Sequence, residues 1–535
     1  MLSPHAEEST LEIEHKKEGF AHLYPKEKIP RPSKICSQLD GLIDIKDQLE
    51  FLYALYPIID GLLDRNGLKT AFFEIESPIQ SILSSMECTG IGFKADRLMS
   101  AEDSVKEQIN KLTIEARAIT DDNTFTLSSP QQVSHYLFDK LGLMTPESVG
   151  FGTQSKSSTV QQHHSTSEES LKALQKQVKT KSGESLRIID IILQFRALNK
   201  MLTTYILPYP KLARECVHIS TRGAQDRTKK KAKSNRVKKI HPMWMQTAVR
   251  TGRLSCRKPN LQQVPAGNNL GFSPRSAFTS STKYTCLFAC DYSQNEVRIL
   301  AHMSNDPALI RMFNDPKTTD IYIQMASVIS GKCSDDISDE ERSTAKQLTL
   351  AIMYGMGPNT VASKLGVGLS TAKQFFESFY GRFKGVKKWK EKTLQLARKN
   401  KYVETITGRK RYLYNIDSDD RSLSAQAERQ AINTVIQGSA ADLMKLAMLK
   451  MASRITDWRK EGTGNGETGI PPRILLQIHD ELLFELVANQ ADVDKLKETV
   501  TRCCTEECVD ELQLKVPLKL KCSVGTSWGS MQEIS

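Results

Sequence analysis

Two aspartates end apolar runs of the kind that form buried strands. Asp291 follows TCLFAC, and Asp480 lies in a polar His-Asp-Glu tip between two apolar runs, a pattern that predicts a hairpin. Because a lone carboxylate is costly to bury, we expect the two to share cations. Two oxygen ligands that leave room for water and phosphate suit Mg²⁺, and ions ~3.5 to 4 Å apart can support phosphoryl transfer. Taken singly, either residue is more ordinarily a turn residue or a helix cap.

A predicted helix between the two aspartates carries a second candidate group. In ERSTAKQLTLAIMYGMG, Arg342, Lys346, Leu350 and Tyr354 recur every four residues and so share one slowly drifting face. Two cations followed by an aromatic ring suit a triphosphate at one end and a stacked base at the other. The alternative is a solvated first turn followed by a core tyrosine.

The elements that must position these groups are mostly helical. The 535 residues exceed a single compact core, so we expect several subdomains. Apolar residues at three- and four-residue intervals predict helices at 104–119, 185–207 and 439–455, and a shorter one around 51–68. The Ser- and Gln-rich segment 148–167 predicts a flexible insert, and 461–469 a surface loop.

Composition narrows the class of protein. The net charge is +12, and segment 222–239 alone carries +8, which suits a polyanion, a nuclear import signal or a solvated loop. The 11 cysteines are an odd number without C-x-x-C spacing, which favours reduced thiols in an intracellular protein. No apolar stretch approaches the ~20 residues of a membrane helix, so we expect a soluble protein without membrane contact.

Several motifs together resemble a known family. DYSQNEVRILAH (291–302), RSTAKQLTLAIMYG (342–355) and QIHDELLFE (477–485) resemble the three polymerase motifs of the A-family DNA polymerases, in the family's order. Three further segments match at 251–265, 405–413 and 427–445. SPRSAF (273–278) and AQAERQAIN (425–433) look closest to the eukaryotic theta and nu repair polymerases.

The resemblance implies a right-hand polymerase fold of the α+β class, with an antiparallel palm sheet, helical fingers and a helical thumb. The expected domains are an N-terminal segment (1–76), a thumb (77–239, with insert 148–167 and basic block 222–239), a first palm segment (240–302), fingers (303–420) and a second palm segment (421–535). The basic block is expected to add sequence-independent phosphate contacts.

The resemblance also assigns roles at the metal and nucleotide sites. Asp291, Asp480 and the carbonyl of Tyr292 would hold two Mg²⁺ ions, with Mn²⁺ as an alternative, and Glu481 would assist. Arg342 and Lys346 would bind the triphosphate, Lys346 also serving as proton donor, and Tyr354 would lie at the nascent base pair. Glu296 takes the position of a steric gate against a ribose 2′-hydroxyl. The remaining expected nucleotide contacts are Gln294 and Leu350.

Primer-template DNA would be held by a third set of residues. Arg253, Asn433 and Gln437 would face the minor groove, where acceptors common to correct pairs allow geometry to be checked without reading sequence. Arg429 and His479 would support the primer terminus, and Asn260 completes the expected DNA contacts.

Two positions depart from the family pattern. Leu350 stands where the family usually has an aromatic ring against the incoming sugar, so we expect weaker nucleotide binding or lower fidelity. Asn295 stands where an aliphatic residue is usual beside the gate, and we expect altered selectivity there. Harmless packing variation is the alternative at both positions.

The expected function is template-directed addition of deoxynucleotides to a primer 3′ end. About 75 residues precede Ser77, too few for the family's exonuclease domain, so we expect no proofreading. Repair, translesion synthesis or end joining in the nucleus, by a monomer acting on dNTPs and primer-template DNA, is the expected setting. A catalytically impaired DNA-binding scaffold and a single-subunit RNA polymerase are the alternatives, and Glu296 argues against the latter.

Overall fold

The computed structural model describes residues 45–143, 164–178, 183–215, 237–267, 273–316, 320–365, 368–458 and 470–534. Residues 148–163 of the predicted insert, 222–236 of the basic block and the predicted loop 461–469 lie outside them. The chain divides into two units, Met1–Phe72 and Phe73–Ser535, a boundary four residues before the one expected. In the first unit, α1 (Ile45–Arg65) confirms the helix predicted around 51–68.

The second unit is built on a five-stranded antiparallel sheet in the order β12-β11-β6-β10-β9. Its strands are β6 (Thr285–Tyr292), β9 (Arg473–Ile478), β10 (Glu481–Val487), β11 (Leu520–Gly525) and β12 (Gln532–Ile534). β9 and β10 form the predicted hairpin, and His479 and Asp480 are its two-residue tip. The buried strand predicted before Asp291 is confirmed as β6.

Both faces of this sheet are covered, because successive side chains of a strand point to opposite sides. Phe288 and Phe484 lie in one hydrophobic cluster, where their rings meet edge to face with centroids 6.2 Å apart. Leu287 and Leu483 lie in a second cluster on the other side. The apolar runs are therefore continuous instead of alternating with polar residues, as expected of strands buried on both faces.

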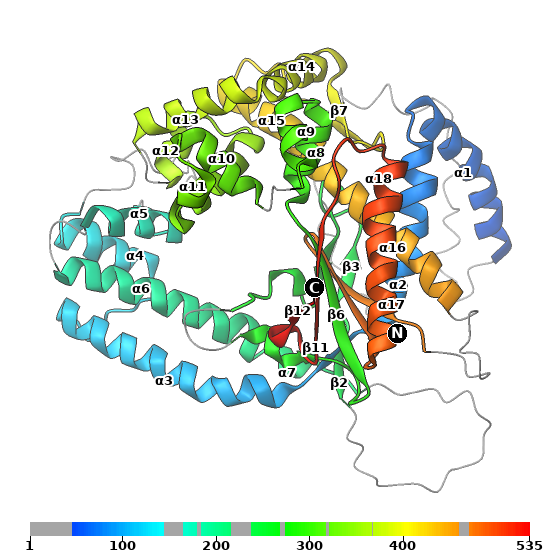
Figure 1. Cartoon of the computed structure of the whole chain (residues 1–535). Helices are drawn as coiled ribbons and strands as arrows, with labels where there is room; N and C mark the ends of the chain where they lie inside the picture. The colour runs from blue at the N-terminus through cyan, green and yellow to red at the C-terminus, as the bar shows by residue number, and fades with distance from the viewer. Residues whose placement is uncertain are drawn as a thin grey trace, which may run out of the picture. The chain divides into compact units, whose positions relative to one another are not determined.

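The second cluster joins the sheet to the helix-rich segment that precedes it. In Figure 1, α3 (Ala95–Thr120) and α6 (Gly183–Met201) are long helices that pack on each other, and η5 (Leu202–Ile206) continues α6, which confirms the helices predicted at 104–119 and 185–207. The shorter elements of this segment are α2 (Ser77–Thr89), α4 (Pro130–Ser134), η3 (His135–Lys140), α5 (Glu168–Val178) and α7 (Tyr209–Leu212).

Helices also fill most of the chain between β6 and β9, as predicted. They are α8 (Asn295–Ser304), α9 (Pro307–Asn314), α10 (Ile321–Ser330), α11 (Asp339–Met353), α12 (Pro358–Leu365), α13 (Leu369–Arg382), α14 (Lys384–Asn400), α15 (Arg421–Asn433), η9 (Thr434–Gly438) and α16 (Ser439–Trp458). After β10 come α17 (Gln490–Thr501), η10 (Arg502–Glu507) and α18 (Cys508–Glu511). No helix among the described residues is both long and apolar enough to cross a bilayer.

Short strands complete the unit. They are β1 (Ile91–Phe93), β2 (Lys238–Ile240) and β5 (Phe278–Thr279) in one sheet, β3 (Met243–Met245) with β4 (Ser255–Arg257), and β7 (Tyr402–Glu404) with β8 (Lys410–Tyr412).

Helix α11, which carries the predicted stripe, has both ends fixed by local sequence. Ser338 and Glu341 form a capping box at its start, each side chain accepting a backbone N–H from the other residue. At its end, Tyr354 is followed by Gly355, whose φ of +71° is one that other residues rarely adopt. Arg342, Lys346 and Leu350 therefore lie on one continuous helix, and Tyr354 is the residue that caps its C-terminal end.

Candidate active site

Three carboxylates lie close together where β6 ends and β10 begins. Asp291 of β6 lies directly across from Glu481 of β10 in the antiparallel register. Asp480 is the neighbouring residue at the hairpin tip, and its carbonyl accepts a hydrogen bond of 3.0 Å from the Tyr292 N–H. His479 makes the tight turn possible with a φ of +54°. The two aspartates singled out in the sequence are thus brought together at one end of the sheet.

The carboxylates are close enough to influence one another electrostatically. The pKa of Asp291 is raised to about 7, first because the surrounding protein desolvates the charged form and then because Glu481 and Asp480 repel it. Desolvation likewise raises the pKa of Asp480 and of Glu481, although Arg253 opposes the shift at Asp480. A cation at this end of the sheet would relieve the repulsion.

This donor set suits a metal ion that takes only some of its coordination from protein. In the portion of the chain that the structure describes, no three His, Cys, Asp or Glu side chains gather tightly enough to hold an ion by themselves. Mg²⁺ commonly uses one or two carboxylates and keeps its other positions for water and phosphate oxygens. Asp291, Asp480 and the Tyr292 carbonyl therefore fit Mg²⁺ shared with a phosphate-bearing substrate.

Glu481 is held by two residues that the sequence had not singled out. Trp528 Nε1 donates a hydrogen bond of 3.3 Å to one carboxylate oxygen, and Arg275 Nη1 lies 4.0 Å from the other. The Arg275 guanidinium also stacks 4.1 Å from the centre of the Trp528 ring. Trp528 and Arg275 therefore hold the Glu481 carboxylate in position next to the two aspartates.

Glu296, the predicted steric gate, is fixed in place. It lies in the first turn of α8 with only 8% of its surface exposed. The Tyr354 hydroxyl donates to it at 2.7 Å, and Arg253 forms an ion pair with its other oxygen. Burial and the Glu296 charge raise the pKa of Tyr354, so this hydroxyl keeps its proton and donates. Three residues from separate sequence motifs therefore form one cluster.

The loop that carries Arg253 is itself supported by buried charges. Gly252 has a φ of +81°, and a Cβ there would collide with the Arg409 guanidinium. Arg409 pairs with Asp442, which is fully buried, and with Glu76, whose carboxylate also accepts from Lys445 at 2.6 Å. This buried network was not predicted, because its members come from three distant segments and each is ordinary in its own sequence context.

The cations of α11 have local partners of their own. Arg342 donates from Nε to Asp320 Oδ2 at 2.7 Å, and Gln294 Nε2 donates to the other oxygen at 3.3 Å. Lys346 is exposed, with its Nζ 5.8 Å from the centre of the Tyr322 ring. Asp320 and Tyr322, at the start of α10, were not predicted site residues.

The two positions that depart from the family pattern differ in burial. Leu350 is half-buried and packs against the first hydrophobic cluster. Asn295 is only 1% exposed, and its amide has no hydrogen bond of normal geometry among the described residues. It nevertheless lies close enough to Asp480 to oppose the rise in that residue's pKa, which desolvation causes.

The predicted DNA contacts fall in different places. Asn433 and Gln437 are half-buried, one turn apart at the junction of α15 and η9, and Gln437 lies beside the Tyr354 hydroxyl. His479 is exposed at the hairpin tip. Asn260 caps η6 (Leu261–Gln263), accepting the Gln262 N–H at 3.1 Å. Arg429 is exposed and lines another hollow with Gly355, apart from His479.

The sequence as a whole matches a known family. The profile described as DNA polymerase family A matches residues 95–530, which include the carboxylate cluster, α11 and Arg253. The chain belongs to DNA polymerase family A. The family membership and the antiparallel sheet with its helices confirm the predicted right-hand polymerase fold of the α+β class.

Two of the relatives are bacterial polymerases. The chain is 34% identical over 460 residues to the thermostable DNA polymerase I of Thermus aquaticus, covering 86% of this chain and 48% of that protein. It is 32% identical over 466 residues to DNA polymerase I of Bacillus subtilis, covering 87% and 46%. The family A chain thus spans about half the length of the curated relatives it matches.

A solved structure agrees with this assignment. The polymerase domain of Pol1 from M. smegmatis, in complex with DNA primer-template and dNTP, matches with a TM-score of 0.74 and 28% identity. The match covers 90% of this chain and 74% of that one.

Proposed function

We propose that this chain is a template-directed DNA polymerase that adds deoxynucleotides to the 3′ end of a primer. The observation that carries the proposal is the convergence of Asp291 and Asp480 at the end of β6 and the β9–β10 tip. The family membership and the DNA and dNTP bound by the structural relative support the same reaction.

Divalent cations bound by the aspartates would activate the primer hydroxyl and stabilise the charge on the leaving pyrophosphate. Binding of the nucleotide, proton transfer and exclusion of ribonucleotides would be carried out by side chains of this chain. Arg342 and Lys346 would orient the triphosphate, and Lys346, which is exposed, would supply a proton to the leaving group. Glu296, held by Tyr354 and Arg253, would exclude a ribose 2′-hydroxyl.

The half-buried amides of Asn433 and Gln437 would contact the primer-template. Arg253 would leave Glu296 and join them when DNA binds. His479 at the hairpin tip would support the primer terminus, Arg429 would contact DNA beside Gly355, and Asn260 would hold its loop in shape. These roles rest on motif position and on where the side chains lie.

Finer features of the function remain proposals. The bound ion is proposed to be Mg²⁺, which Mn²⁺ could replace. The chain is proposed to act in the nucleus, in repair, translesion synthesis or end joining, as the theta and nu polymerases do. It is also proposed to act as a monomer and to synthesise DNA without proofreading. The proofreading prediction is checked by incubating a primer with a mismatched 3′ end without dNTPs, where no shortening is expected.

Primer extension tests the main proposal. The chain is expected to extend a primer with dNTPs and not with NTPs, and Asp291→Asn is expected to lower the rate by at least about 10³-fold. Extension with NTPs at a similar rate would favour the RNA polymerase alternative. If the native chain binds primer-template but extends with neither, the scaffold alternative holds.

A further inference from the structure

A large cavity lies at the other end of the palm strands. It is about 1790 Å³ in volume and is lined by Thr285 of β6 and Val487 of β10, which face each other at the ends opposite the carboxylates. Asp291 is six positions beyond Thr285 along β6, and at ~3.3 Å per residue the cavity lies about 20 Å from the carboxylate cluster. Pockets for small ligands are usually ~300 to 1,000 Å³, so this one has room for a larger ligand.

The lining of this cavity is strongly cationic. Six Lys and Arg side chains line it against two carboxylates, a surplus of four positive charges. Lys94, Arg214 and Arg473 form no ion pair among the described residues, and all three are exposed. One of the carboxylates, Glu485, is buried and already accepts from Ser281 Oγ at 3.0 Å and Thr285 Oγ1 at 3.1 Å. Glu215 is the other carboxylate, so these two acids leave four of the six positive charges of the lining unbalanced.

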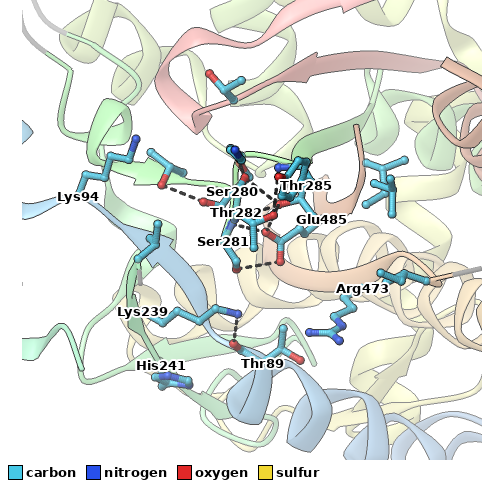
Figure 2. A pocket seen from close by; sticks show the side chains of 18 of the residues that line it. Thr89, Lys94, Lys239, His241, Ser280, Ser281, Thr282, Thr285, Arg473 and Glu485 are labelled. Atoms are coloured by element: carbon cyan, nitrogen blue, oxygen red, sulfur yellow. Dashed lines mark hydrogen bonds between the residues drawn. The ribbon is translucent and has the colours of Figure 1, made fainter. Parts of the chain in front are cut away.

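Lys239 of β2 gives independent support for an anionic ligand. Its surface is only 8% exposed, and its Nζ donates to the neutral Thr89 carbonyl at 3.0 Å, as Figure 2 shows. Arg214 lies directly opposite Lys239, and the two exchange backbone hydrogen bonds of 2.8 and 2.9 Å. Like charges opposite each other across strands are destabilising, and a nearly buried cation without an anion is costly. An anion in the cavity would remove both costs.

The rim adds features that suit nucleic acid. Ser280, Ser281 and Thr282 bring hydroxyl groups to the cavity, where Figure 2 shows them between Lys94 and Arg473. The next aromatic side chain, Tyr284, is 69% exposed. Cations that follow a phosphate backbone beside an exposed aromatic ring for base stacking are the combination used by proteins that bind single strands.

We propose that this cavity binds a stretch of single-stranded nucleic acid, with Lys94, Arg214, Lys239 and Arg473 on its phosphates and Tyr284 stacked on a base. The site is separate from the proposed polymerase site and does not depend on catalysis. It gives the chain a second place to hold an unpaired strand while the carboxylate end is occupied by a primer-template.

The test measures binding to the full chain with the polymerase site filled. An excess of blunt hairpin DNA occupies the polymerase site, and a fluorescent dT12 oligonucleotide is then titrated by anisotropy at several salt concentrations. The double variant Lys94→Glu/Arg473→Glu is expected to bind about 10-fold more weakly, with a salt slope reduced by about 1.4, since each single-strand phosphate contact contributes ~0.7. Tyr284→Ala is expected to lose about 5-fold in affinity.

A matched control changes the same charges elsewhere. Lys392→Glu/Lys399→Glu, two exposed residues of α14, is expected to leave dT12 binding unchanged. An oligonucleotide carrying 5-iodouracil should crosslink to Tyr284 of the native chain. Equal weakening by both double variants, or crosslinks that avoid residues 279–285 and 470–473, would overturn the proposal.

Two further outcomes distinguish this strand site from a small-anion site and from the polymerase site. If inorganic triphosphate binds the cavity and dT12 does not, the ligand is a small polyphosphate and the strand proposal fails. Primer extension by Lys94→Glu/Arg473→Glu is expected to equal that of the native chain. A chain that extends primers but has no second dT12 site would contradict only this inference, whereas one that binds dT12 but extends nothing would contradict only the proposed function.

Discussion

Arg342 donates a hydrogen bond of 2.7 Å from Nε to Asp320 Oδ2, and its Nη2 lies 2.6 Å from the same oxygen as an ion pair. The same aspartate caps α10 by accepting the Tyr322 N–H at 2.8 Å. The arginine proposed to grip the triphosphate therefore already holds an anion, and an incoming nucleotide must compete with Asp320 for it.

Replacing Asp320 by Asn is expected to improve nucleotide binding. Asn is as good a helix cap as Asp, so α10 keeps its start, but the competing charge is lost. A partly exposed ion pair contributes ~0.2 to 1 kcal/mol, so the KM for dNTP should fall by about 1.4- to 5-fold with kcat little changed. Steady-state primer extension measures this, and a raised KM would mean that Asp320 orients Arg342 for the nucleotide.

Tyr354→Phe is expected to weaken sugar discrimination. The substitution removes the 2.7 Å hydrogen bond to Glu296 and leaves only Arg253 to position that carboxylate. A hydrogen bond to a charged group is worth ~1.5 to 3 kcal/mol, so the preference for dNTP over NTP, as a ratio of kcat/KM, should fall by about 10-fold or more. Tyr380→Phe, at another half-buried tyrosine, is the control, and an unchanged ratio in both variants would remove Tyr354 from the gate.

Leu350→Tyr is expected to strengthen nucleotide binding. Leu350 is only half-buried, on the same face of α11 as Arg342 and Lys346, and a ring at this position is expected to contact the incoming sugar. An aromatic contact adds ~0.5 to 1.5 kcal/mol, which would lower the KM for dNTP by about 2- to 10-fold. Leu350→Met, which keeps the volume without a ring, should behave like the native chain. Unchanged kinetics for the tyrosine variant would show that this position does not limit binding.

Asp291→Asn is expected to stabilise the protein at high pH and not at low pH. The folded-state pKa of Asp291, about 7, lies above the ordinary value of ~3.9, so the folded state holds the proton more tightly. Ionisation of Asp291 therefore lowers the free energy of unfolding progressively as the pH rises from about 4 to 7. Above pH 7 the whole loss of stability is present.

Thermal unfolding in EDTA measures the effect. The protein around Asp291 partly desolvates the carboxylate, but the residue keeps an accessible surface that solvent screens, so the cost is discounted to about 1 kcal/mol. Asn should raise the Tm by about 1 to 3 °C at pH 8 and by nothing at pH 4. Adding Mg²⁺ at pH 8 should favour the native aspartate and reverse the difference. Equal Tm differences at both pH values would mean that Asp291 does not interact with Glu481 and Asp480 as described.

The sequence could predict those features of the candidate site that depend on residues close together along the chain. The stripe of α11 follows from helical periodicity, and its ends from Ser338, Glu341 and Gly355, all within 20 residues. The tip at Asp480 follows from two apolar runs around a polar pair, because two-residue turns fix hairpin register. The strand before Asp291 was visible for the same local reason.

Tertiary packing decided which charges meet. Nothing local pairs Arg342 with Asp320, Arg253 with Glu296 or Arg409 with Glu76, since these contacts span 22, 43 and 333 residues. The cationic cavity is likewise lined by residues of β2, β9 and the segment before β6. Each of these segments carries only one or two positive charges, so none of them stands out in the sequence. The amino-acid order determined the main helices, the strand that ends at Asp291 and the hairpin with Asp480 at its tip. The folded chain alone determined their partners, because electrostatic interactions depend on distance in space and not on separation along the chain.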